Sequence, residues 1–178
     1  QVSMLMITHR ACLNHDPGPY HPECPDRLRA VLKALDAQEF SELIRDQAPR
    51  ATEEQLMRVH PENYVKAILG IRPEPGETVP LDGDTIMCWG SAEAALRSAG
   101  AAIAATDAVM KGEFRHAFCA TRPPGHHAEP NRPMGFCFFA NAAVAARHAQ
   151  AEHGAKKVAV VDFDVHHGNG TQACFEAD

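Results

Sequence analysis

The apolar positions of the chain follow two patterns, short continuous runs and longer stretches in which they recur every three or four residues. Short apolar runs are typical of strands, and they predict strands at 2–8, 116–121 and 157–164. The recurrence every three or four residues predicts helices, which we expect at 26–37, 52–59, 61–69, 92–110 and 141–153. The segments 9–25 and 70–90 are rich in Pro and Gly, and we expect loops there.

Several predicted helices begin at residues that can cap free backbone N–H groups. Thr52 and Gln55 have the spacing of a capping box, in which each side chain bonds the backbone of the other residue. Ser91 and Asn141 are placed to cap the two helices that follow them. The helix over 92–110 is rich in alanine, and its small side chains favour tight packing against a sheet.

The order of the last predicted elements indicates how the strands are arranged. The strand over 116–121, the helix over 141–153 and the strand over 157–164 form a strand–helix–strand unit, whose two strands are expected to be parallel. Ligands of open parallel sheets bind at the carboxyl ends of the strands. We therefore expect an α/β domain with its chemistry at that edge.

Composition excludes several classes of function. The chain has 178 residues, 45% of them hydrophobic, which is enough for a core, and its formal charge of -6 argues against a nucleic-acid-binding surface. An acidic surface is compatible with cationic substrates. No apolar stretch approaches the roughly 20 residues that span a bilayer, and no signal peptide is recognisable. None of the six cysteines forms a Cys-x-x-Cys pair, so we predict no zinc finger. Together with the missing signal peptide and membrane span, these cysteines predict a soluble, cytoplasmic protein with no membrane partner.

Two carboxylates and an imidazole follow the last apolar run at alternating positions. Asp162, Asp164 and His166 share one face of an extended segment, and the Gly168-Asn169-Gly170 turn comes next. Oxygen and nitrogen ligands at this spacing suit half of a zinc site. The structural alternative is an aspartate that caps the turn beside a surface histidine.

Two adjacent histidines stand in a second polar segment, Arg122-Pro123-Pro124-Gly125-His126-His127-Ala128. Imidazoles in a Pro- and Gly-rich loop after a strand are poor material for a core. They are well suited to proton transfer near neutral pH.

The motifs taken together resemble those of the zinc-dependent histone deacetylase family, which includes bacterial deacetylase-like and acetylpolyamine amidohydrolase enzymes. They occur in the family's order: His-Pro-Glu-Cys-Pro-Asp-Arg at 21–27, Pro-Pro-Gly-His-His-Ala at 123–128, Met-Gly-Phe-Cys at 134–137 and Asp-Phe-Asp-Val-His-His-Gly-Asn-Gly at 162–170. The resemblance implies a three-layer α/β/α fold with a mainly parallel sheet, as in the arginase/deacetylase group. It also implies that 1–178 is the N-terminal portion of a single deacetylase domain, apparently truncated, because the family's third metal ligand and its transition-state Tyr come later.

The resemblance assigns roles to the residues of both clusters. Asp164 and His166 would bind Zn²⁺, and His126 and His127 would move protons between water, substrate and leaving amine. Asp162 would orient His126. The family's second orienting residue corresponds to Asn169, an asparagine typical of the class II branch, which would orient His127 without a full negative charge.

Further roles concern substrate and a second ion. Gly135 and Phe136 correspond to the tunnel that holds the methylenes of an acyl-lysine or a polyamine arm. The family's acidic rim residue, which grips the substrate backbone, corresponds to Asp84 (or Asp82). Main-chain oxygens at 162, 164 and 166 would hold a monovalent cation such as K⁺.

The function implied is hydrolysis of the acetyl amide of N-acetyl-lysine peptides or acetylated polyamines. We expect little turnover by 1–178 alone. We also expect homo-oligomers. Two alternatives stay open. One is a non-catalytic fragment that acts as a binding or interaction module, and the other is a ureohydrolase-like hydrolase with two manganese ions.

Overall fold

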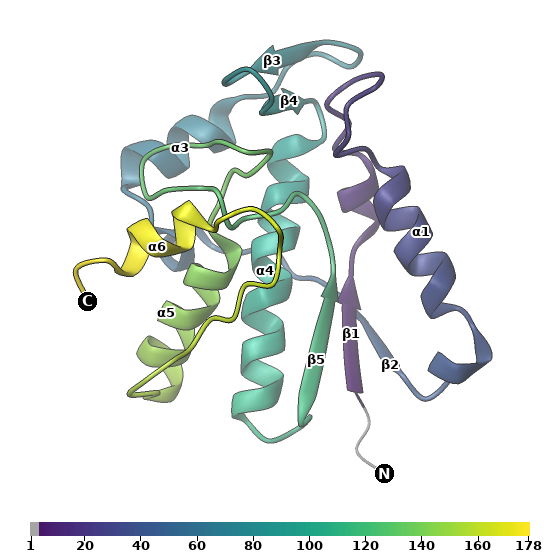
Figure 1. Cartoon of the computed structure of the whole chain (residues 1–178), viewed down its shortest axis with the longest axis vertical. Coiled ribbons are helices and arrows are strands. Elements are labelled where there is room, and N and C mark those ends of the chain that lie inside the picture. Colours follow the sequence, from purple (N-terminus) through teal and green to yellow (C-terminus); the bar gives the residue numbers. More distant parts are fainter. Residues whose placement is uncertain (1–3) are drawn as a thin grey trace.

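A parallel sheet of three strands forms the centre of the computed structural model, which describes residues 4–178 (Figure 1). The strands β1 (Met4–Thr8), β2 (Ile44–Gln47) and β5 (His116–Ala120) lie in the order β2-β1-β5. Leu5 lies opposite Ile44 on one side and opposite Ala117 on the other. The predicted strand over 2–8 is confirmed from residue 4, and residues 2 and 3 lie outside the described part.

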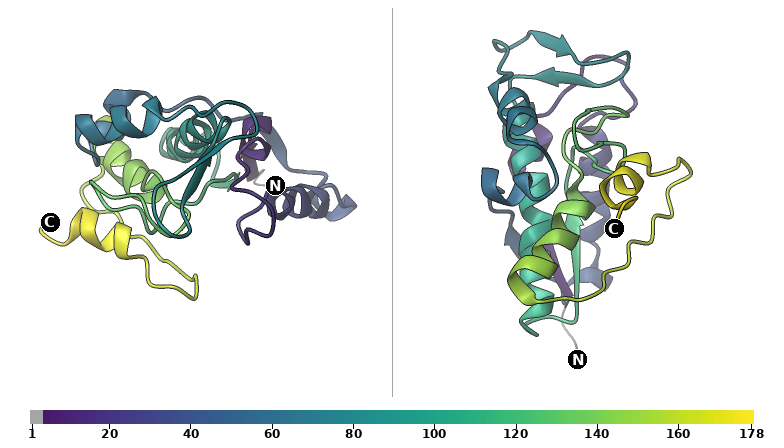
Figure 2. Two further views of the ribbon diagram at one scale, coloured as in Figure 1. Left: turned by 90° about the horizontal axis from the view of Figure 1, so that it is seen from above. Right: turned by 90° about the vertical axis from the view of Figure 1, so that its left-hand side faces the viewer.

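Side chains of β1 alternate between the two faces of this sheet, and each face is covered by helices. Leu5 and Ile7 pack with the alanine-rich helix α4 (Ser91–Met110), whereas Met6 faces the other side and packs with Leu28 of helix α1 (Asp26–Leu35). Successive strand residues point to opposite faces, so each face buries its own set. The helices therefore lie on both sides of the sheet (Figure 2). The predicted three-layer α/β class with a mainly parallel sheet is confirmed.

The remaining helices extend the layer on the side of α4. The helix α5 (Asn141–His153) packs along α4, and α2 (Glu53–Met57) and α3 (Glu62–Gly70) cover the end of both. Phe138 and Phe139 are fully buried where these helices meet. Two short 3₁₀ helices span Arg10–Leu13 and Gln38–Phe40. Over residues 4–178, every helix is too short or too polar to cross a membrane.

Besides the two 3₁₀ helices, three strands and one α-helix were absent from the sequence prediction. The loop expected over 70–90 contains an antiparallel hairpin of β3 (Thr78–Pro80) and β4 (Ile86–Cys88), and the strand β2 and the helix α6 (Asn169–Phe175) were also missed. The residues of β2 and β3 are exposed throughout. They therefore lack the apolar alternation by which a strand is recognised.

One of the three predicted helix caps is confirmed. Thr52 and Gln55 form the capping box at the start of α2. Ser91 and Asn141 were wrong as caps, because each is the first residue of its helix and its side chain bonds elsewhere. The Ser91 hydroxyl accepts the N–H of Cys88, and the Asn141 amide donates to the carbonyl of Pro123.

The segment 157–164 does not form the predicted strand. The segment runs extended away from α5, and no described strand forms a ladder with it, so the predicted parallel pairing with β5 is also wrong. Its apolar side chains lie in solvent, with Val161 85% and Phe163 98% exposed. A strand needs neighbours that satisfy its backbone and cover its side chains, and neither is present here.

Candidate functional site

A buried arginine fixes the start of the loop that follows β5. Arg122 is 2% exposed, and its guanidinium donates to the two carboxylate oxygens of Glu23 at 2.8 and 2.6 Å. It also donates to the backbone carbonyls of Cys12, His15 and Glu23. This set of bonds ties the segment 9–25 to the carboxyl end of β5, beside the paired histidines.

The carboxylate that Arg122 grips is itself almost inaccessible, with 1% of Glu23 exposed. Burial alone would raise the pKa of Glu23, but the hydrogen bonds from His15 and Arg122 outweigh it and hold that pKa below its ordinary value. Glu23 is therefore an ionised partner of Arg122. Sequence reasoning missed this pair, although an arginine directly after an apolar strand is itself an unusual signal.

The first histidine of the pair is held by an acidic side chain from the second cluster. Nδ1 of His126 lies 2.7 Å from Oδ2 of Asp162, and this hydrogen bond holds the pKa of Asp162 below its ordinary value. The bond also fixes the orientation of the His126 ring. A Cβ atom on Gly168 would lie 2.4 Å from the same oxygen, so a larger residue there would displace the Asp162 carboxylate.

The second histidine is held by an amide. Nδ1 of His127 lies 2.6 Å from Oδ1 of Asn169, whose Nδ2 donates to Glu129 and to the sulfur of Met134. These donations turn the amide oxygen toward His127, so Nδ1 of His127 carries the proton and Nε2 keeps a lone pair. The rings of His126 and His127 lie 4.0 Å apart between centroids. The structure thus brings together the two histidines predicted to transfer protons and the two residues predicted to orient them.

The two candidate metal ligands are also neighbours. Nδ1 of His166 lies 3.1 Å from Oδ1 of Asp164, which lies 4.0 Å from Nε2 of His126. Hydrogen bonding from the backbone N–H of His166 lowers the pKa of Asp164, so the carboxylate is ionised. That bond is also what the structural alternative, an aspartate capping a turn, requires. Both side chains are open to solvent, with 50% of Asp164 and 73% of His166 exposed.

The monovalent-cation site expected at 162, 164 and 166 lies in the same exposed segment. No strand ladder fixes the carbonyl groups of this segment, so K⁺ binding stays a prediction.

The residues expected to form the tunnel contact the paired histidines and the hairpin. Gly135 has φ +56°, and a Cβ atom there would lie 2.4 Å from Cδ2 of His127. Phe136 also has a positive φ, +71°, and its N–H donates to the hydroxyl of Thr85. Its ring meets the ring of His21 at 4.9 Å and 71°. This backbone turn presses against His127 on one side and presents the aromatic ring on the other.

A cavity of about 960 Å³ opens beside Phe136. Asp84 lines it, whereas the Asp82 carboxylate accepts the N–H groups of Asp84 and Thr85 and so forms the turn of the hairpin. The acidic residues Asp16, Glu77 and Asp84 line the cavity, and within residues 4–178 its lining contains no lysine or arginine. Its electrostatic field therefore favours cationic ligands.

A thiol with unusual surroundings also lines this cavity. Burial alone would raise the pKa of Cys88, but hydrogen bonds from His15, the Asp16 N–H and Ser91 lower it to about 6. By contrast, burial raises the pKa of Cys119 to about 11. The sequence carried no signal for Cys88, because two of its partners, His15 and Asp16, come from the distant segment 9–25.

Several known proteins that are similar to the chain are described as deacetylases. The Histone deacetylase domain family matches residues 21–178. A Histone deacetylase-like amidohydrolase of Pseudomonas aeruginosa is 42% identical over 182 aligned residues, which cover 92% of this chain and 47% of that protein. A Histone deacetylase 14, chloroplastic, of Arabidopsis thaliana is 36% identical, with 98% of this chain and 45% of that protein covered. A Probable deacetylase of Archaeoglobus fulgidus is 35% identical, with 97% and 48% covered.

A solved structure agrees with these sequence relatives. The crystal structure of the HDA15 HD domain matches with a TM-score of 0.91 and 37% identity, and the match covers 98% of this chain and 50% of that one. The chain therefore spans about half the length of the relatives that it matches.

Proposed function

The chain belongs to the histone deacetylase family, and from this premise we propose that it supplies the paired histidines and two metal ligands of a zinc-dependent amidohydrolase. The reaction would remove acetyl groups from N-acetyl-lysine or acetylated polyamines. The observation that carries the proposal is the arrangement of the two imidazoles. They lie 4.0 Å apart, one held by a carboxylate and the other by an amide oxygen.

The two histidines would divide the proton transfers between them. The lone pair on Nε2 of His127 would accept a proton from the attacking water, since Asn169 holds the proton of that ring on Nδ1. His126, whose ring is held by the carboxylate of Asp162, would stabilise negative charge and protonate the leaving amine. Because the rings adjoin, proton transfer at one changes the field at the other.

The donor atoms present fit zinc. The carboxylate of Asp164 and the imidazole of His166 are oxygen and nitrogen donors 3.1 Å apart, next to His126. When bound, zinc polarises a carbonyl and makes water more acidic. Catalytic zinc takes three protein ligands, so this pair would be part of the full set. Both side chains lie in the exposed segment and are open to a further ligand.

The cavity beside Phe136 would receive the substrate. Its ring would flank the methylenes of the acylated chain, and Asp84 on the rim would accept hydrogen bonds from the substrate's N–H groups. The acidic lining suits an acetylated chain that carries further positive charges, as a polyamine or a basic peptide does.

We further propose that 1–178 is the N-terminal part of one deacetylase domain and has little activity alone. The exposed apolar residues over 158–165 and the free edge of β5 support this, because each offers surface that a packed domain covers. The same surface favours the second candidate, a binding module. Location in the cytoplasm and assembly into homo-oligomers remain predictions.

Acetate release by the native protein that contains this sequence tests the proposal. Acetyl-lysine peptide and N-acetylated polyamine would be compared as substrates. Substitution of His127→Ala is expected to remove turnover, while His116→Ala, at an exposed histidine of β5, is expected to leave it unchanged. Binding of either substrate without acetate release by the native protein would favour the binding module instead.

A further inference from the structure

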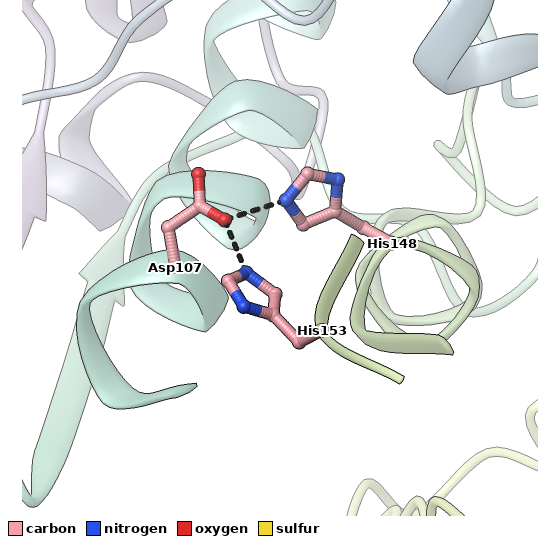
Figure 3. Close-up of side chains that lie close together, drawn as sticks. All are labelled: Asp107, His148 and His153. Atoms are coloured by element: carbon pink, nitrogen blue, oxygen red, sulfur yellow. Dashed lines mark hydrogen bonds and ion pairs between the residues drawn. The ribbon is translucent and has the colours of Figure 1, made fainter. Parts of the chain in front are cut away.

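A second cluster of histidine and carboxylate side chains lies between α4 and α5. Asp107 projects from α4, and His148 and His153 project from α5 toward it (Figure 3). Oδ1 of Asp107 lies 2.7 Å from Nε2 of His148 and 2.6 Å from Nε2 of His153. Two helices that already pack together thus bring three metal-binding side chains to one point.

The cluster is separate from the paired histidines. Asn141, the first residue of α5, contacts the carbonyl of Pro123 in the loop before His126. His148 lies seven residues further along α5, which corresponds to about 10 Å along the helix axis. His153 is the last residue of that helix. The family match assigns no role to these side chains.

The donor set suits a divalent cation of the zinc type. One carboxylate oxygen and two imidazole nitrogens lie within 4.8 Å of one another, and this combination binds zinc, cobalt and nickel. Both imidazoles already contact the same oxygen of Asp107, so the three donor atoms converge on one point.

The exposure of the three side chains leaves a route to solvent. His148 is 5% exposed, His153 15% and Asp107 34%, so the cluster opens on the side of Asp107. A cation could enter there and keep a water molecule as its fourth ligand.

The side chain of Arg58 competes with a cation for this cluster. Nη1 of Arg58 lies 2.9 Å from Nδ1 of His148, and a guanidinium only donates hydrogen bonds. Nδ1 of His148 therefore holds a lone pair, and its proton is on Nε2, where it bonds Asp107. A metal ion on Nε2 requires that proton to move to Nδ1, so Arg58 must withdraw. Nη2 of Arg58 already bonds Glu152, which is half exposed and can retain the guanidinium.

We infer that Asp107, His148 and His153 form a second divalent-metal site, which joins α4 to α5 and in which Arg58 competes with the cation. On binding, the proton on Nε2 of His148 moves through solvent to Nδ1, so that Nε2 can bind the cation. The cation replaces two N–H···O bonds with three metal–ligand bonds between the same helices. Without metal, the same side chains hold the helices together through hydrogen bonds.

Cobalt titration of the metal-free native protein that contains this sequence tests this inference, since Co²⁺ reports its ligands by visible absorption. The titration uses a background with Asp164→Asn and His166→Ala, so that the proposed catalytic ligands do not contribute. We expect a tetrahedral Co²⁺ band and a metal-dependent rise in melting temperature. Both should be lost in Asp107→Asn, which keeps an oxygen to accept a histidine N–H, and in His153→Ala.

Arg58→Gln separates this inference from a purely structural role of the cluster. The Gln oxygen can accept the N–H of Nδ1 in place of the competing guanidinium, and changes to such supporting partners alter metal affinity about 10- to 100-fold. We therefore expect Arg58→Gln to tighten cobalt binding by a factor in that range. The inference is overturned if neither the background protein nor Arg58→Gln binds Co²⁺, or if the band survives Asp107→Asn and His153→Ala.

Discussion

His127 and Asn169 are joined by a 2.6 Å hydrogen bond between segments 42 residues apart in the sequence. The bond fixes the proton of His127 on Nδ1 and leaves Nε2 free to act as a base. The amide of Asn169 is itself oriented by hydrogen bonds to Glu129 and Met134, so its oxygen points toward His127. The proposed base would thereby be oriented before substrate arrives.

Substitution of Asn169→Ala is expected to lower kcat of the native protein by about 10²-fold or more, the usual contribution of a positioned acid or base. KM should change little, because Asn169 is not among the residues that line the cavity beside Phe136. Asn169→Asp preserves an acceptor and should retain most activity, with the acid limb of its rate–pH profile moved to higher pH. Equal losses in both variants would argue that Asn169 acts through packing alone.

Gly135→Ala should disturb His127 directly. The new Cβ would lie 2.4 Å from the His127 ring, and a positive φ costs an alanine about 1–2 kcal/mol. Gly112→Ala is a matched control, because Gly112 also has a positive φ, but a Cβ atom added there would meet nothing within 4 Å. Urea unfolding should show a loss of stability in both variants, larger in Gly135→Ala because of the contact with His127, and acetate release should fall only in Gly135→Ala. If Gly135→Ala kept full activity, the close packing of this turn on His127 would be irrelevant to catalysis.

Arg122→Leu should be strongly destabilising, because it leaves the buried carboxylate of Glu23 without its main partner. Breaking a buried ion pair in this way costs about 3–5 kcal/mol. Arg122→Lys should recover only part of this loss, since an ammonium group cannot make the two-pronged contact. The exposed pair of Arg29 and Asp26 is the control, and Arg29→Leu should cost less than about 1 kcal/mol in the same denaturation assay. A small effect of Arg122→Leu would contradict the structural role given to this pair.

The pH dependence of stability should report Glu23. Its pKa is lower in the folded protein than its ordinary value of 4.5, so the folded state binds fewer protons there than the unfolded state. Its contribution is therefore complete above about pH 4.5 and is lost as the pH falls through the folded-state pKa. Unfolding followed by circular dichroism between pH 6 and pH 2 should show this decline, and Glu23→Gln should flatten it. An unchanged acid limb in Glu23→Gln would assign the decline to other carboxylates.

Cys88 should be the first thiol to react with iodoacetamide near pH 7. Its pKa of about 6 makes it mostly thiolate at that pH, whereas burial raises the pKa of Cys137 to about 12. Peptide mapping by mass spectrometry after brief labelling would identify the modified residue. Preferential labelling of Cys24 or Cys174 instead would show that access, and not ionisation, controls reactivity in this chain.

The sequence predicted the residues that meet at the site better than the elements that carry them. The motifs at 123–128 and 162–170 meet as expected, because side-chain bonds such as that between His126 and Asp162 connect them. The strand expected over 157–164 did not form, since apolar content alone does not supply a neighbouring strand. The helix caps predicted at Ser91 and Asn141 are wrong, because both side chains form hydrogen bonds with residues outside their helices.

Contacts between distant segments were beyond the reach of local patterns. Glu23 and Arg122 are 99 residues apart, and each lies in a motif that gives no hint of the other. The cluster of Asp107, His148 and His153 was missed for the same reason. Asp107 lies on one helix and both histidines on another, and only the packing of α4 on α5 places them together.

Zinc-dependent acetate release is the most direct test of the proposed function. The native protein that contains this sequence would be stripped of metal, assayed on an acetyl-lysine peptide and on an acetylated polyamine, and assayed again after addition of one equivalent of zinc. We expect zinc to restore acetate release, and to fail to do so in Asp164→Asn and in His166→Ala. Full activity of the metal-free protein, or equal rescue by zinc in both variants, would contradict the assignment of these two residues as zinc ligands.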